Sequence, residues 1–180
     1  LFFRYMNMNN YGFIRTAAAP ISTRVANPTY NTRTSIHNAV IEAESHQVSL
    51  LVFPELCISG YSCGDLFGHG LLLKKCEEEV ASLAGYSYEK NMAIVVGAPV
   101  PFNGRLYNCA VVIRDGEIMG ITPKTCISGL QRRWFTSGSG ISSESEITYA
   151  GQTCAFSQSL LFRLGDAKMA VEFGDELGTP

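Results

Sequence analysis

The chain has 180 residues; 46% are apolar, 17% are charged and the formal net charge is −2. This length and composition fit one globular domain, and they exclude a disordered chain and the clustered basic surface of a nucleic-acid-binding protein. No apolar stretch reaches the roughly 20 residues that cross a membrane, and the first residues lack the pattern of a secretory signal.

The cysteines and histidines bear on redox state and metal binding. The cysteines lack C-x-x-C spacing, and disulfide frameworks are typical of much smaller secreted proteins. The three histidines are too few and too dispersed for a zinc site. We therefore expect reduced thiols, no metal and a cytoplasmic location. The cysteines are Cys57, Cys63, Cys76, Cys109, Cys126 and Cys154.

Strand-like and helix-like stretches alternate through the first hundred residues. Apolar runs predict strands, and apolar residues at helical spacing predict amphipathic helices. In chain order the pattern predicts a strand over 13–19, a helix over about 31–46, a strand over 48–53, a helix over 71–83 and a strand over 93–100. The last strand is a continuous β-branched run, as expected when both faces of a sheet are covered.

The helix predicted over 71–83 has an apolar and a charged side. We expect its leucines and valine, Leu71 among them, to face the core. The charged run that ends at Glu79 is expected to face solvent.

The second half of the chain favours β-structure. The Asp115-Gly116 pair lies between apolar runs at 106–113 and 117–121, which predicts a hairpin. Residues 137–145 are rich in Ser and Gly and predict a loop, and strand character resumes over 159–173. The whole order predicts an α/β layered domain with a mixed sheet.

Two charged residues follow prolines at the ends of predicted strands. Glu55 comes after Phe53-Pro54, and Lys124 comes after Thr122-Pro123. An isolated glutamate at a strand end is more often a solvated side chain. Because carboxyl ends of strands are where open α/β folds place reactive groups, the two together form a candidate acid/base pair.

Five segments together resemble the nitrilase, or carbon–nitrogen hydrolase, superfamily. They more narrowly resemble the N-terminal glutaminase domains of glutamine-dependent NAD synthetases. The segments are Tyr11–Arg15, Ala17–Pro20, Phe53–Phe67, Pro123–Thr125 and Arg133–Thr136. The resemblance implies a nitrilase-like α-β-β-α sandwich with a mixed sheet, apparently truncated on its C-terminal side. Residues 1–180 would then form a partial glutaminase domain without the ATP-dependent synthetase domain.

The resemblance also implies a Glu-Lys-Cys triad that hydrolyses glutamine. A cysteine attacks the carboxamide carbon, the glutamate acts as general base and the lysine stabilises the oxyanion. Glu55 and Lys124 match the first two positions, and Tyr61 is a candidate for binding the substrate. The family implies a homo-oligomer, no metal or cofactor in this domain, and ATP with magnesium only in the synthetase domain.

The third triad position departs from the family. The nucleophile belongs in a segment like Gly-Val-Glu-Ile-Cys-Glu-Asp-Leu-Trp, and this chain has Gly174 at the cysteine position, followed by the acidic pair in reversed order. Glycine offers no side chain for attack, and losing such a nucleophile costs turnover on the order of 10⁶. Cys126 is a weak candidate to replace it, on the assumption that the strand continues past Lys124. Glu172 is expected to be a hydrogen-bonding partner near this turn.

The loop after Lys124 is also shorter than in the family, and no acidic residue remains between Lys124 and Arg133. The leading interpretation is therefore a glutaminase domain of NAD synthetase that lacks turnover in this form. The alternatives are another amidase of the superfamily, or a non-catalytic binding or assembly module on the same fold.

Overall fold

The computed structural model describes residues 13–178, so the Tyr11-Gly12 part of the first motif lies outside the described residues. Its centre is a five-stranded sheet in the order β1-β2-β3-β4-β5. The first three strands are parallel and the last three antiparallel, which confirms the mixed sheet. The strands are β1 Thr16–Ala18, β2 Leu50–Val52, β3 Ala93–Phe102, β4 Arg105–Arg114 and β5 Glu117–Pro123.

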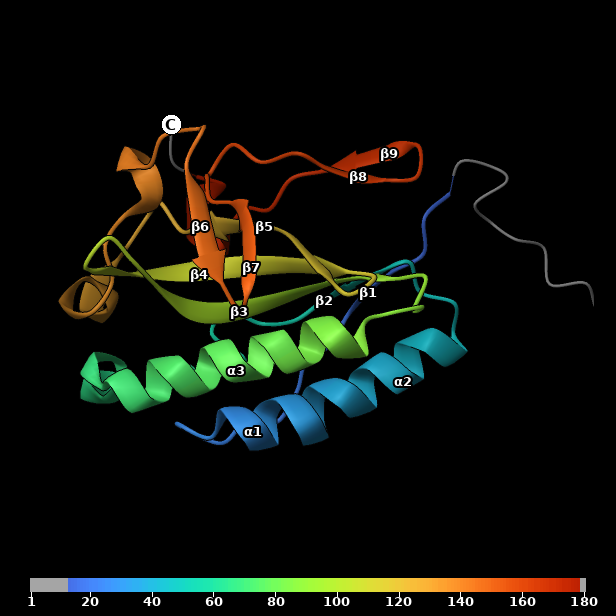
Figure 1. Ribbon diagram of the computed structural model, residues 1–180, viewed down its shortest axis with the longest axis horizontal. Helices are drawn as coiled ribbons and strands as arrows, with labels where there is room; N and C mark the ends of the chain where they lie inside the picture. The colour runs from blue at the N-terminus through green and yellow to red at the C-terminus, as the bar shows by residue number, and fades with distance from the viewer. Residues whose placement is uncertain (1–12, 179–180) are drawn as a thin grey trace, which may run out of the picture.

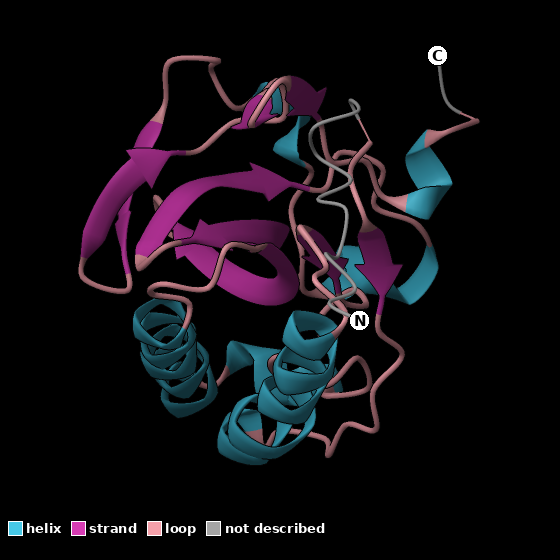
Figure 2. Cartoon of the chain, turned by 90° about the vertical axis from the view of Figure 1, so that its right-hand side faces the viewer, coloured by secondary structure: helices cyan, strands magenta, loops and turns pink. Residues whose placement is uncertain are grey.

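Helices cover one face of this sheet (Figure 1). α1 (Pro28–Tyr30), the π-helical η2 (Asn31–Ile36) and α2 (His37–Ser45) run on from one another, and α3 (Gly70–Tyr86) lies beside them. The Asn27 side chain accepts a hydrogen bond from the Tyr30 N–H and so caps the first turn, where Pro28 is well tolerated. Figure 2 shows the helices together on one side of the strands.

Two short hairpins pack beside the sheet, one along β5 and against α3, and one on the face opposite the helices. β6 (Glu146–Tyr149) pairs with β7 (Gln152–Ala155), and β8 (Phe162–Leu164) pairs with β9 (Ala167–Met169). Phe162 of β8 packs with Val95 and Val112 in a small apolar cluster on the face opposite the helices. Ile147 and Cys154 of the β6–β7 hairpin belong to the larger core, which lies between the sheet and the helices. Short 3-10 turns complete the described chain: η3 Gly64–Gly68, η4 Gly129–Arg133, η5 Gly138–Gly140 and η6 Gly174–Glu176.

The order of elements agrees with the sequence prediction, and the hairpin at Asp115-Gly116 is confirmed. Both turn residues have positive φ, 51° and 86°, as the Asp-Gly pair predicts. The β6–β7 hairpin was not predicted, because its turn residues Ala150 and Gly151 carry no Asn-Gly or Asp-Gly signal although both have positive φ. Strand character after β8 ends at Met169, so residues 170–173 are not strand.

The prediction for the two sides of α3 was wrong at two residues. Leu71 is 74% exposed, whereas Glu79 is 2% exposed. The buried positions Leu72, Cys76 and Leu83 place the core side of the helix one residue away from Leu71. Glu79 is buried because its carboxylate accepts hydrogen bonds from the Thr29 hydroxyl at 2.8 Å and the Arg33 guanidinium at 3.0 Å.

Candidate active site

Glu55 lies in a tight turn directly after β2, residues 54–57, which we call the Glu55 turn. The Cys57 N–H donates to the Pro54 carbonyl at 3.3 Å, and Leu56 has a positive φ of 53°. A non-glycine residue with positive φ is uncommon and needs support from its surroundings. Leu56 and Cys57 are buried, so the core supplies that support.

Gly97 on β3 allows this turn to lie against the sheet. The Ile58 N–H donates to the Gly97 carbonyl at 3.1 Å, and the Gly97 N–H lies 3.3 Å from the Cys57 sulfur. A Cβ atom at position 97 would lie 2.8 Å from the Cα of Glu55 and would overlap the Leu56 nitrogen. Only glycine therefore permits so close an approach of the two backbones.

Lys124 enters the site from the end of β5. Its N–H donates to the carbonyl of Asn108 on β4 at 2.8 Å, which extends the antiparallel ladder by one pair beyond Cys109 and Pro123. Residues paired in this way present their side chains to the same face of a sheet. The ladder thus brings the Asn108 amide and the Lys124 ammonium to one place.

The structure brings Glu55 and Lys124 together. The Lys124 Nζ lies 3.2 Å from both carboxylate oxygens of Glu55. The lysine side chain is 2% exposed and the glutamate side chain 24% exposed, so solvent reaches the pair from the carboxylate side. The Asn108 Nδ2 also donates to Glu55 Oε1.

Tyr61 and Gln131 form the outer part of the site. The Gln131 Nε2 lies 2.8 Å from Glu55 Oε1 and 2.9 Å from the Tyr61 hydroxyl. Tyr61 is 58% exposed, so it lies at the rim. The sequence analysis named Tyr61 but missed Gln131 and Asn108. Their only sequence signal is position, since Gln131 lies in the shortened loop before Arg133 and Asn108 lies opposite Lys124 in the predicted hairpin.

Residues 173–176, which we call the Gly174 turn, lie beside the Lys124 segment. The Phe173 ring is buried, and its centroid is 5.6 Å from the Lys124 Nζ. Glu176 accepts hydrogen bonds from the Thr125 hydroxyl at 2.6 Å, the Cys126 N–H at 3.2 Å and the Phe173 N–H at 3.0 Å. The position expected for the nucleophile is thus tied to the strand end that carries the lysine.

Partial burial of Glu176 opposes its ionisation, but the hydrogen bonds from Phe173, Thr125 and Cys126 outweigh it and lower the pKa of this carboxyl group. Glu172, the partner predicted for this turn, is exposed, and no hydrogen bond to its carboxylate is found within residues 13–178. Glu176 therefore makes the hydrogen bonds near this turn that the sequence analysis expected of Glu172.

Gly174 is exposed, and a Cβ built there would meet no atom within 4 Å. The turn therefore has room for a cysteine side chain. The argument for Cys126 as a substitute nucleophile fails in its premise, because β5 ends at Pro123 and the alternation of a strand does not extend to Cys126.

Two segments of the family resemblance contact each other at the rim. The Asp65 carboxylate accepts hydrogen bonds from the Trp134 indole at 3.0 Å and from the Arg133 guanidinium at 3.2 Å. The Phe67 ring packs edge-on against Phe135 with centroids 4.8 Å apart. These contacts attach the C-terminal end of η4 to η3.

The buried cysteines are not activated nucleophiles. Burial raises the pKa of Cys57 to about 12 and that of Cys154 to about 11, and it also raises the pKa values of Cys63, Cys76 and Cys109. Because the thiolate is the reactive form, these thiols are inert at neutral pH. They are small core residues.

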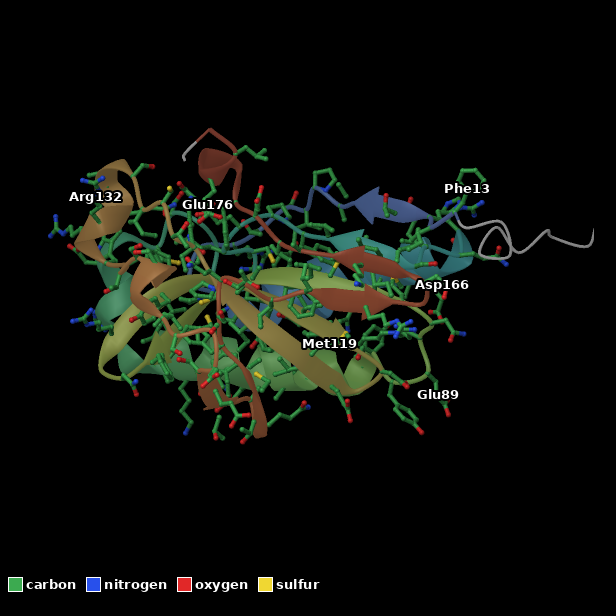
Figure 3. The ribbon with its side chains drawn as sticks, turned by 90° about the horizontal axis from the view of Figure 1, so that it is seen from above. Phe13, Glu89, Met119, Arg132, Asp166 and Glu176 are labelled. Carbon is green, nitrogen blue, oxygen red and sulfur yellow. The ribbon has the colours of Figure 1, made fainter. Side chains whose placement is uncertain are left out.

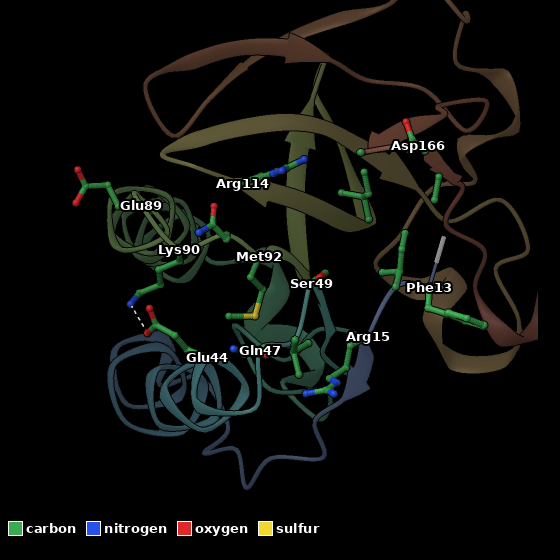
Figure 4. A pocket seen from close by; sticks show the side chains of 16 residues that line it. Phe13, Arg15, Glu44, Gln47, Ser49, Glu89, Lys90, Met92, Arg114 and Asp166 are labelled. Carbon is green, nitrogen blue, oxygen red and sulfur yellow. Dashed lines mark hydrogen bonds and ion pairs between the residues drawn. The ribbon is translucent and has the colours of Figure 1, made fainter. Parts of the chain in front are cut away.

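A cavity of about 860 Å³ lies at the other end of the strands. Its lining includes Ser49 and Met92, which precede β2 and β3, whereas Glu55 follows β2. Figure 3 shows Glu176 and Arg132 toward one end of the molecule and Phe13 and Asp166 toward the other. Figure 4 shows the Lys90–Glu44 ion pair at the edge of this cavity. The cavity is therefore separate from the Glu55–Lys124 site.

The carbon-nitrogen hydrolase family matches residues 15–167 of this chain. The chain belongs to this family, and its mixed sheet with Glu55 and Lys124 at two strand ends is the arrangement that the sequence resemblance predicted. No helix among residues 13–178 is long and apolar enough to cross a membrane.

Among carbon-nitrogen hydrolases, the chain is similar to glutamine-dependent NAD(+) synthetases. The chain is 33% identical over 160 residues to the glutamine-dependent NAD(+) synthetase of Mycobacterium tuberculosis, which covers 87% of this chain and 23% of the relative. It is 34% identical over 121 residues to that of Mycobacterium leprae, which covers 67% and 18%. The chain thus spans about a fifth of the length of these curated relatives.

Solved structures of the same family have a similar fold. A glutamine-dependent NAD(+) synthetase from Cytophaga hutchinsonii superposes with a TM-score of 0.78 and 26% identity, over 86% of this chain and 27% of that one. An amidase from Nesterenkonia sp. superposes with a TM-score of 0.61 and 19% identity, over 79% of this chain and 54% of that one. The second likeness shows the shared nitrilase fold.

Proposed function

We propose that this chain is the glutamine-hydrolysing domain of an NAD synthetase whose catalytic site lacks its nucleophile. In an intact parent protein the domain would hydrolyse glutamine and supply ammonia for ATP-dependent amidation of deamido-NAD. ATP and magnesium would belong to the synthetase domain, and a cytoplasmic homo-oligomer is part of the proposal. The observation that carries it is the Glu55–Lys124 contact at 3.2 Å beside a turn with glycine at the cysteine position.

The proposed roles follow from the chemistry of amide hydrolysis. A thiol with an ordinary pKa near 8.5 needs a base at neutral pH, and the Glu55 carboxylate would take its proton as sulfur bonds to the carboxamide carbon. The Lys124 ammonium would face the oxygen that becomes negative in the tetrahedral intermediate. Ammonia would then leave with the proton, and water would hydrolyse the thioester.

With glycine at position 174 the first bond cannot form, so we expect glutamine hydrolysis to be absent. Binding of a primary carboxamide does not require the thiol. The second candidate function is therefore binding alone, in which the site holds a carboxamide ligand without hydrolysing it.

The experiment restores the thiol with Gly174→Cys and measures ammonia release from glutamine. The matched control is Gly178→Cys, since position 178 is also exposed with no atom within 4 Å of a built Cβ. We expect ammonia release in Gly174→Cys alone, and its loss when Glu55→Gln is added. Ammonia release by the unmodified chain would show that the nucleophile argument is wrong, whereas no release from a folded Gly174→Cys variant would favour the binding function.

A further inference from the structure

Gln131 makes an unusual set of contacts for a loop residue. Its Nε2 donates to Glu55 Oε1 at 2.8 Å and to the Tyr61 hydroxyl at 2.9 Å, and its Oε1 lies 3.5 Å from the Asn108 Nδ2. The side chain is half-buried, and its terminal carboxamide reaches the carboxylate proposed as the general base. A carboxamide of this chain therefore already lies in the site.

The chemistry of this contact matches that of the proposed substrate. The end of a glutamine side chain is a primary carboxamide, with two N–H donors and one carbonyl acceptor. Glu55 Oε1 accepts from Asn108, Gln131 and Lys124, so its acceptor capacity is already used. An external carboxamide can approach this oxygen only if one of these donors leaves.

Gln131 is the donor that the fold holds least firmly. Asn108 is fully buried in β4, and Lys124 is buried at the end of β5. The segment η4 contains no buried residue, and Leu130 next to Gln131 is exposed. Removing Gln131 from the site would break hydrogen bonds but would not uncover core.

We propose that Gln131 is an internal ligand of the site, which holds the place of a primary carboxamide against Glu55 and must be displaced before an external one binds. The inference rests on the proposed function for its ligand class. Gln131 thus sets the apparent affinity of the site. If Gln131 only braced Glu55, its removal would weaken binding.

The test measures binding of acetamide and of L-glutamine by calorimetry to the chain that retains Gly174, so no turnover intervenes. The variants are Gln131→Ala and the matched control Gln158→Ala, whose glutamine is exposed and outside the site. Each hydrogen bond that the ligand no longer has to replace contributes roughly fivefold, so two bonds give about 25-fold tighter binding to Gln131→Ala. Unchanged or weaker binding relative to the control overturns the proposal.

A second measurement covers the case in which Gln131→Ala alters the fold. In the 15N-labelled unmodified chain, saturating acetamide is expected to move the side-chain amide signals of Gln131 toward the values of exposed glutamines, with those of Gln158 unchanged. Signals of Gln131 that stay unchanged at saturation overturn the proposal.

The two proposals fail separately. If Gln131→Ala binds the ligand more tightly but Gly174→Cys releases no ammonia, the glutaminase assignment is wrong and the internal-ligand proposal stands. The opposite result is that Gly174→Cys releases ammonia, while adding Gln131→Ala changes neither the KM for glutamine nor ligand binding. That result would support the glutaminase assignment and overturn the internal-ligand proposal.

Discussion

The Glu55 turn and the Gly174 turn belong to one site but are attached to the fold in different ways. The Glu55 turn lies on β3 with buried residues on either side, and its carboxylate meets a buried lysine. The Gly174 turn is exposed at residue 174 and is held mainly by Phe173 and Glu176. The geometry of the Glu55–Lys124 half is therefore built into the core, whereas a Cβ atom at position 174 would meet no neighbouring atom.

This difference explains how the site keeps its charged pair with no nucleophile present. Displacing the Glu55 turn would disturb the contact with Gly97 and break the ion pair with the buried Lys124, and both changes would lower stability. At position 174 a Cβ atom would touch no other atom, so glycine there leaves no packing contact unmade. Packing thus constrains the Glu55 turn much more than it constrains position 174.

The largest predicted difference between the two turns is in the free energy of unfolding after alanine replaces Gly97 or Gly174. Gly97→Ala would force a Cβ into the Glu55 turn and is expected to lower the free energy of unfolding by at least about 3 kcal/mol. Gly174→Ala, the same change in the other half, is expected to alter it by less than about 0.5 kcal/mol, because its Cβ meets open space. Urea unfolding measures both, and similar losses in the two variants would contradict the comparison.

A second prediction concerns the Glu55–Lys124 ion pair. A double-mutant cycle with Glu55→Gln and Lys124→Met is expected to give a coupling energy of about 2 kcal/mol, since the lysine is buried and solvent reaches only part of the carboxylate. The control is the same cycle on the exposed pair Lys75 and Glu78, where solvent screening leaves a much smaller coupling. Equal coupling in the two pairs would mean that burial does not strengthen the contact at the site.

The smallest expected effect is on the pH dependence of the Gly174 turn. The folded pKa of Glu176 is lowered, so its stabilising contribution is present above the ordinary value of 4.5 and is lost as pH falls through the lower folded value. Glu176→Gln should cost about 1 kcal/mol at pH 7 and should flatten the fall in stability below pH 4.5.

Unfolding measured from pH 7 to pH 3 checks this prediction. Glu172→Gln is the control, because Glu172 is exposed and its carboxylate has no hydrogen bond within residues 13–178. An acid profile of Glu176→Gln identical to that of the unmodified chain would refute the bridging role of Glu176.

Sequence patterns predicted the layered fold well where the signal is local. Apolar runs marked the three parallel strands, and Asp115-Gly116 marked the central hairpin. The face of α3 was misjudged because burial of Glu79 depends on Arg33 and Thr29, which lie 46 and 50 residues away. A charge run is solvated by default, and only a distant partner reverses that.

By itself the sequence determined the two charged groups of the site and the lack of a side chain at position 174. Glu55 and Lys124 each follow a proline at a strand end, and position 174 has no side chain, all of which are covalent facts of the chain. Tertiary structure alone decided that two charges 69 residues apart meet. It also decided that Gly97 leaves room for the Glu55 turn and that the Gln131 side chain donates to the Glu55 carboxylate. Strand register and the packing of a loop set these distances, and neither can be read from the spacing of residues along the chain.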